Sequence, residues 1–71
     1  MFVPKMQPVE SSAVARIGYD EAAEEAYVEY LGGGLYAYEG VPADVFEELT
    51  NADSKGTFVN EVIKEYPFRE L

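Results

Sequence analysis

Three short runs of alternating apolar and polar residues lie in the first half of the chain and predict three β-strands. They cover residues 13–19, 26–31 and 35–39, and they are rich in Val, Ile and Tyr, which favour extended backbone. A triple glycine at residues 32–34 separates the second run from the third, and glycine adopts the positive φ angles of tight turns at little cost. The pattern therefore predicts a three-stranded antiparallel β-meander.

The cross-strand register follows from the glycine turn and from one pair of charges. A three-glycine loop pairs Leu31 with Leu35, and pairing residue 19 with residue 26 brings Arg16 opposite Glu29, which is a favourable charge pair. Side chains alternate between the two faces of a strand. One face of the sheet then carries an apolar set, with the cross-strand pairs Ile17–Val28, Val28–Tyr38 and Tyr30–Tyr36.

Two amphipathic segments follow the strands and predict two α-helices. Pro42 suits the first position of a helix, and apolar residues at helical spacing come after it. Asp53 or Ser54 can cap a second helix, and Pro67 ends it. The helices would cover the apolar face of the sheet.

The predicted fold class is α+β: a three-stranded antiparallel β-meander followed by two α-helices packed on one face (β-β-β-α-α). A single domain is expected over residues 11–71. Residues 1–10 contain two prolines, which block regular helix, and they are expected to form an extended N-terminal arm.

The composition narrows the classes of function. Fourteen acidic and five basic side chains give a net charge of −9, which repels nucleic-acid phosphates and anionic membranes and favours basic partners. The chain has neither cysteine nor histidine, so the common zinc sites and nucleophile–base pairs are absent, and we expect a non-catalytic protein without cofactor or metal. The acidic turn at residues 20–25 leaves loose binding of a divalent cation as an alternative. No apolar run suits a signal peptide or membrane helix, so a cytoplasmic monomer is expected.

Five residues are candidates for a binding site. Tyr36 and Tyr38 either pack against the helices, as buried aromatic residues commonly do, or stack nucleobases. Lys55 and Gly56 stand at the start of the second predicted helix, where backbone N–H groups can bind an anion. A capped helix start with close packing at Gly56 is the structural alternative. Asn60 is expected to be a buried structural residue, with ligand binding as its alternative.

The second face of the sheet is a candidate docking surface. Because a two-layer domain leaves one sheet face uncovered, apolar side chains near the glycine turn would form an exposed patch of the kind that marks partner sites. Coverage by the N-terminal arm would remove this surface. The predicted residues of this face are Val14, Arg16, Tyr27, Leu31 and Leu35.

Several short motifs in a fixed order give the chain a resemblance to a known family. They are Ser11-Ser12, Ile17-Gly18-Tyr19-Asp20, Tyr36-Ala37-Tyr38, Val41-Pro42, Ala52 and the segment 54–60. Their order and spacing over residues 9–66 resemble the KTSC domain, a family named for its occurrence at the C-terminus of some lysyl-tRNA synthetases. Ala26 and the triple glycine depart from the family pattern. The resemblance implies a small module of unknown biochemical function, with RNA association suggested by the synthetase context.

Two functions therefore stay open. The preferred one is a small non-catalytic interaction module that binds a protein partner through the second sheet face. The alternative is an RNA- or tRNA-associated accessory module, and it requires that Lys55, Lys64 and Arg69 create a local basic spot within the acidic chain.

Overall fold

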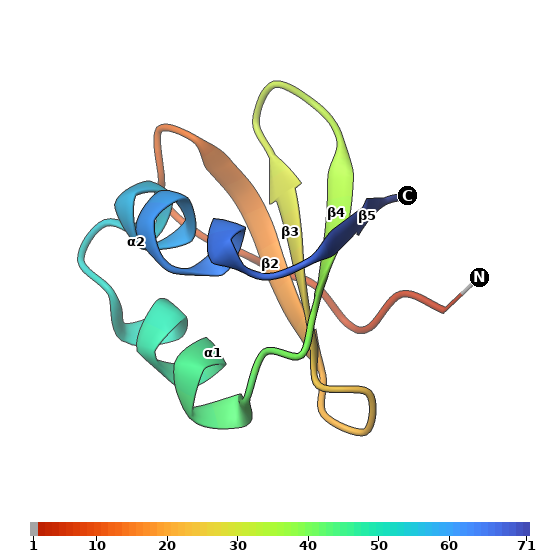
Figure 1. Cartoon of the computed structure of the whole chain (residues 1–71). Helices are drawn as coiled ribbons and strands as arrows, with labels where there is room; N and C mark the ends of the chain where they lie inside the picture. Colours follow the sequence, from red (N-terminus) through yellow and green to blue (C-terminus); the bar gives the residue numbers. More distant parts are fainter. Residues whose placement is uncertain (1) are drawn as a thin grey trace.

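A five-stranded antiparallel sheet with helices on one of its faces makes up the computed structural model, which describes residues 2–71 (Figure 1). The strands lie side by side in the order in which they occur in the sequence. They are β1 Gln7–Pro8, β2 Val14–Asp20, β3 Glu25–Tyr30, β4 Leu35–Glu39 and β5 Phe68–Glu70. The helices are α1 Ala43–Asn51, α2 Lys55–Glu61 and the 3₁₀ helix η1 Ile63–Glu65.

The α+β class, the central meander and the two helices agree with the sequence prediction. The predicted number of strands was wrong, because the sheet has five strands instead of three. The predicted arm contains β1, which pairs with the outer edge of β2. Its proline is tolerated there because an edge strand has one unpaired side. The chain after Pro67 forms β5 and pairs with β4. Strands of two and three residues are too short to show an alternating pattern in the sequence.

The predicted register between β2 and β3 is confirmed. Ile17 lies opposite Val28, and Arg16 lies opposite Glu29. The Arg16 guanidinium and the Glu29 carboxylate form an ion pair at 2.5 Å. The charge pair in the sequence therefore indicated the correct alignment of these strands.

The predicted register between β3 and β4 was wrong by two residues. Leu35 pairs with Glu29 instead of Leu31, and Tyr36 pairs with Val28 instead of Tyr30. Because side chains alternate with a period of two, this shift changes the cross-strand partners but keeps every side chain on its predicted face.

Hydrogen bonds around the glycine turn explain the shift. The Leu31 N–H donates to the Ala13 carbonyl at 2.9 Å, which draws Leu31 away from β4 and toward the start of β2. The turn is closed by Gly33 N–H donating to the Tyr30 carbonyl at 3.0 Å and Tyr30 N–H donating to the Gly34 carbonyl at 3.1 Å. The loop between β3 and β4 therefore includes Leu31 as well as the three glycines.

Val14 lies on the opposite face from the one predicted. A β-bulge between Val14 and Arg16 interrupts the alternation, so the side chain of Val14 turns toward the helices. Val14 is fully buried in the core instead of forming part of the second sheet face.

The core lies between the sheet and the helices. Each fully buried Val, Leu or Ile side chain contributes about 1.5–3 kcal/mol relative to an exposed one. Ser54 caps α2 as predicted, because its Oγ accepts the Thr57 N–H at 3.2 Å. Pro42 immediately precedes α1 instead of occupying its first turn. The buried cluster consists of Val14, Ile17, Ala26, Val28, Tyr38, Val41, Leu49, Val59 and Ile63.

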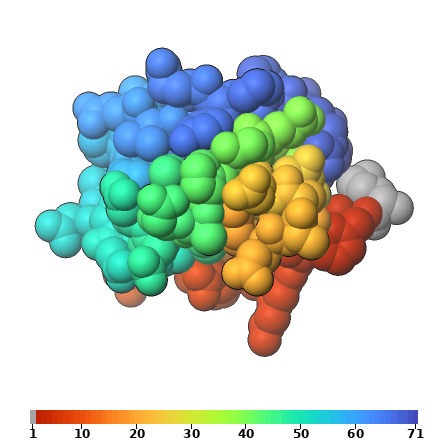
Figure 2. Space-filling model, turned by 60° about the horizontal axis from the view of Figure 1, so that its bottom comes forward, coloured from red at the N-terminus to blue at the C-terminus, as the bar shows by residue number. Residues whose placement is uncertain are grey.

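The molecular surface is continuous across the helices and the β2–β3 turn. Figure 2 shows α1 in green and teal next to this turn in orange, with α2 in blue above α1 and the N-terminal arm in red beneath the turn. Within residues 2–71, no helix combines the length and the apolar character required to cross a membrane.

The glycine turn provides a test of the backbone geometry. Gly33 has φ +103°, whereas Gly32 lies outside the positive-φ region, and a Cβ at either position would meet nothing within 4 Å. Gly33→Ala should therefore lower the free energy of unfolding by about 1–3 kcal/mol through backbone strain alone. The matched variant Gly32→Ala should change it by less than about 0.5 kcal/mol. Urea unfolding of both variants measures the difference, and equal stabilities would contradict the assigned turn.

Candidate functional site

An open pocket of about 420 Å³ lies on the helix-covered side of the sheet, where β3, β4 and β5 meet η1. Its volume falls within the range of small-molecule binding pockets. The lining is mostly aromatic, with one lysine. It consists of Tyr30, Gly33, Tyr36, Tyr38, Lys64 and Phe68.

Strand alternation and pairing bring the aromatic side chains together. Tyr36 and Tyr38 are two residues apart on β4 and point to the same face. Phe68 on β5 lies directly opposite Tyr38, so it shares that face. The ring centroids are 5.6 Å apart for Tyr30–Tyr36, 5.6 Å for Tyr36–Phe68 and 5.9 Å for Tyr38–Phe68.

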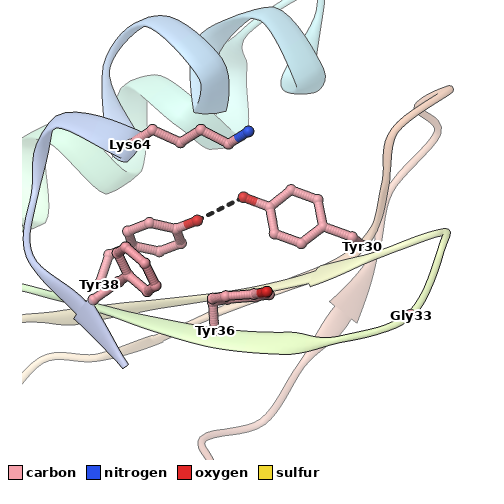
Figure 3. Close-up of a pocket in the computed structure, with 6 residues that line it drawn as sticks. Tyr30, Gly33, Tyr36, Tyr38 and Lys64 are labelled. Carbon is pink, nitrogen blue, oxygen red and sulfur yellow. Dashed lines mark hydrogen bonds between the residues drawn. The ribbon is translucent and has the colours of Figure 1, made fainter. Parts of the chain in front are cut away.

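A hydroxyl–hydroxyl hydrogen bond spans the pocket. The Tyr30 and Tyr38 oxygens are 2.7 Å apart, and Figure 3 shows the two side chains reaching toward each other above Tyr36. Burial raises the pKa of Tyr30 well above its usual range, and the hydrogen bond with Tyr38 adds to the increase. The Tyr30 phenol therefore remains neutral at physiological pH.

Lys64 closes the side of the pocket opposite Tyr36 (Figure 3). Its Nζ lies 5.7 Å from the centroid of the Tyr30 ring, which is within the range of a cation–π interaction. Among residues 2–71, no carboxylate lies within ion-pair distance of Lys64. The lysine thus places a positive charge against an aromatic wall.

The structure brings two of the five predicted site residues into this pocket. Tyr38 is buried and belongs to the core, as expected for its structural alternative, while Tyr36 is half-buried and lines the opening. Tyr30 and Phe68 were missed as site residues. The predicted position of Tyr30 on the same sheet face as Tyr36 could have indicated that it lines the site. Phe68 could not be placed on that face because β5 was not predicted.

None of the other three predicted residues lines the aromatic pocket, but Gly56 and Asn60 line an adjoining hollow that shares Tyr30 and Lys64 with it, whereas Lys55 lies apart from both. The Lys55 Nζ donates to the Ala52 carbonyl at 2.6 Å, at the end of α1. Gly56 packs closely on Ala13, because a Cβ at position 56 would approach the Ala13 Cβ to 3.2 Å. The structural alternative therefore accounts for both residues. Asn60 is exposed, so the expectation of a buried structural residue was wrong.

The N-terminal arm covers part of the second sheet face. A Cβ at Gly18 would lie 2.9 Å from the Lys5 carbonyl, so the arm crosses β2 in direct contact with it. Tyr27 is only 1% exposed, and its hydroxyl donates to the Phe2 carbonyl at 3.4 Å. Tyr27 is therefore not an exposed residue of a docking surface, and the alternative of coverage by the N-terminal arm holds for it. Only Arg16, Leu31 and Leu35 of the predicted docking surface retain exposed or half-buried side chains.

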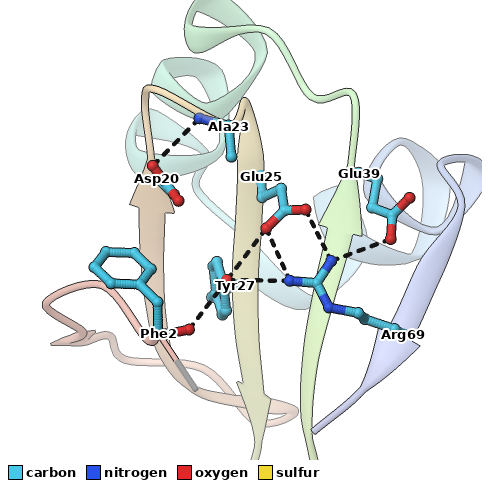
Figure 4. A network of polar contacts seen from close by, with 7 residues as sticks. All are labelled: Phe2, Asp20, Ala23, Glu25, Tyr27, Glu39 and Arg69. Carbon is cyan, nitrogen blue, oxygen red and sulfur yellow. Dashed lines mark hydrogen bonds and ion pairs between the residues drawn. The ribbon is translucent and has the colours of Figure 1, made fainter.

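A polar network ties β5 to the rest of that face. The Arg69 guanidinium contacts both carboxylate oxygens of Glu25, at 2.8 and 3.0 Å, and one of Glu39 at 3.1 Å (Figure 4). Arg69 thereby holds the pKa of Glu25 below its usual range. Because Arg69 faces away from the pocket and Lys55 caps α1, the proposed basic spot with Lys64 does not form.

The acidic turn between β2 and β3 has a structural role. The Asp20 carboxylate accepts the Ala23 N–H at 3.3 Å (Figure 4). Within residues 2–71, no three acidic side chains come together in an arrangement that could hold a metal ion. The alternative of loose cation binding at this turn therefore receives no support.

Comparisons with known proteins agree with this architecture. The sequence profile of the KTSC domain matches residues 10–68, which is most of the chain. The chain belongs to the KTSC domain family. The resemblance seen in the sequence is thereby confirmed.

Relatives of this KTSC domain occur alone and within a larger enzyme. A crystal structure of a KTSC domain protein from Yersinia pestis superposes with a TM-score of 0.92 at 35% identity, covering 94% of this chain and 96% of that one. A protein of Tsukamurella paurometabola is 48% identical over 83% of this chain and 88% of its own length. A lysine–tRNA ligase of Nostoc punctiforme is 35% identical over 96% of this chain, which corresponds to 12% of the ligase.

The Arg69 network should make the stability of this KTSC domain depend on pH. Because the pKa of Glu25 is lowered in the folded state, its contribution is present above the ordinary value of 4.5 and is lost as the pH falls through the lower folded-state value. Thermal unfolding should show that Arg69→Gln flattens the loss of stability between about pH 5 and pH 3. Lys5→Gln, which removes one charge from the arm, should retain the wild-type slope. Parallel slopes for all three proteins would contradict this role of Arg69.

Proposed function

We propose that this KTSC domain is a non-catalytic interaction module that binds a segment of a protein partner in the aromatic pocket. The observation that carries the proposal is the open pocket whose walls are three tyrosines and Phe68. Phe68 is 59% exposed and Tyr36 is half-buried, so a ligand in the pocket would cover apolar surface of both side chains. Aromatic side chains of this kind provide much of the binding energy at protein interfaces.

The chemistry of the pocket supports binding in preference to catalysis. Its polar side chains are the three tyrosine phenols, of which those of Tyr30 and Tyr38 bond to each other, and the exposed Lys64. General acid–base catalysis depends on a group whose pKa is close to the working pH and which lies within reach of a reacting atom. The high pKa of Tyr30 makes it unsuitable as such a base.

The surface for the partner differs from the one expected from the sequence. Val14 belongs to the core and Tyr27 is covered by the N-terminal arm, so the second sheet face offers little apolar surface. The aromatic pocket lies on the other side of the sheet and offers a defined volume. A monomeric state and a cytoplasmic location remain predictions from the sequence.

Association with RNA is the second candidate, and the lysine–tRNA ligase relatives are the observation in its favour. The aromatic rings could stack nucleobases, and Lys64 could contact a phosphate. Against this, the net charge is −9. Arg69 and Lys55 are also engaged by partners within the chain. Protein binding is therefore preferred.

Selection of peptides tests the proposal directly. Random 12-residue peptides displayed on phage are selected on the wild-type domain, and binders are then measured against Phe68→Ala and Leu31→Ala. Phe68 and Leu31 are 59% and 58% exposed, but only Phe68 lines the pocket. We expect Phe68→Ala to weaken binding by at least about tenfold, as for a residue that dominates an interface, and Leu31→Ala to have little effect.

Three outcomes of this experiment would redirect the proposal. Equal binding of the selected peptides to both variants would contradict the pocket as the site. Failure to select any peptide would contradict protein binding. Backbone amide shifts of Tyr36 and Phe68 on titration with a short unstructured RNA or with bulk tRNA, if they disappear at moderate salt, would instead establish the RNA alternative.

A further inference from the structure

The walls of the aromatic pocket have an electrostatic character as well as an apolar one. The Tyr30 and Tyr36 rings meet at 76°, and the Tyr36 and Phe68 rings at 57°. Figure 3 shows the Tyr36 ring edge-on, so one of its faces is turned toward the Tyr30–Tyr38 pair and Lys64. The face of an aromatic ring carries negative potential, and a pocket with several such walls attracts a positively charged group.

The chain itself already places a cation against this pocket. Lys64 belongs to the short η1 helix, its side chain is exposed, and its Nζ lies 5.7 Å from the Tyr30 ring centroid. No carboxylate of residues 2–71 holds the Lys64 ammonium in an ion pair. A flexible lysine without an ion-pair partner can move aside when another cation enters.

The charge of the surroundings also favours a cation. Glu70 lies opposite Tyr36 in the β4–β5 ladder, so its side chain is on the same face of the sheet as the pocket. Glu61 lines the adjoining hollow together with Tyr30 and Lys64. With a net charge of −9 on the whole chain, a basic ligand is attracted and a phosphate is repelled.

We infer that the aromatic pocket binds a cationic side chain, a lysine, an arginine or a methylated lysine, presented by a basic segment of a protein partner. Lys64 occupies the edge of the pocket in the absence of the partner and competes with the incoming cation. This inference rests on the proposed function and adds the chemistry of the partner to it.

Two peptides that differ only in charge test the inference. One is an acetylated pentapeptide with trimethyllysine between pairs of glycines, and the other carries carbon in place of the ammonium nitrogen. Backbone amide shifts of Tyr36 and Phe68 in the isotope-labelled domain report binding at the pocket. We expect the charged peptide to bind about 2- to 30-fold more tightly than its neutral isostere, which is the range of a cation–π contribution.

A pair of lysine variants tests the competition by Lys64. Lys64→Gln and Lys5→Gln each change the net charge from −9 to −10, so their long-range electrostatic effects are matched. Only Lys64 lies at the pocket. We expect Lys64→Gln to increase affinity for the charged peptide more than Lys5→Gln does, and Lys64→Arg to retain the wild-type affinity.

The outcomes separate this inference from the proposed function. Equal affinity of both peptides for the pocket would overturn the inference while leaving an apolar binding module in place. Weaker binding of the charged peptide to Lys64→Gln than to Lys5→Gln would contradict the claim that Lys64 competes with the incoming cation. No shift at Tyr36 or Phe68 with either peptide would overturn the inference, and the phage selection would decide the proposed function separately. Loss of the preference for the charged peptide in Phe68→Leu, which keeps an apolar side chain, would confirm the role of the ring.

Discussion

Burial of one continuous apolar face of the sheet is the constraint on which the rest of this structure depends. Ile17, Val28 and Tyr38 come from three neighbouring strands and are all buried beneath the helices. A slip of one residue in any strand would turn its apolar side chains to the other face, whereas a slip of two preserves them. Burial of the core therefore determines which face of the sheet each side chain occupies, but it does not determine the cross-strand partner of each residue. The hydrogen bonds of the glycine turn select one of the registers that keep the apolar side chains buried.

This distinction explains which parts of the fold could be predicted from the sequence. Alternation identified the central strands and their core face, and the Arg16–Glu29 pair aligned β2 with β3. The alignment of β4 depends on the bond from Leu31 to Ala13, which joins residues far apart in the sequence. Val14 lies on the opposite face from the predicted one because of a β-bulge, and no local sequence pattern predicted this bulge. The two edge strands, of two and three residues, are too short for the alternation of apolar and polar residues to repeat.

The candidate site was predictable to a similar extent. Tyr30, Tyr36 and Tyr38 were expected on one face, and the structure places them together. Their partial exposure depends on how far the helices extend across the sheet, and on β5, which supplies Phe68. The exposure of the outer face could not be decided from the sequence either, because an extended arm could lie free or cover this face, and the structure shows it covering Gly18 and Tyr27. The periodicity of a strand shows which side chains share a sheet face, but whether that face is exposed depends on segments far away in the sequence.

The attachment of β5 links the two faces of the sheet. Phe68 completes the aromatic wall on one side, and its neighbour Arg69 is bound to Glu25 and Glu39 on the other. Because short edge strands open more readily than a buried core, the pocket can lose one wall while the core stays folded. The carboxylates on the outer face thus help to hold in place a strand that supplies one wall of the pocket on the inner face.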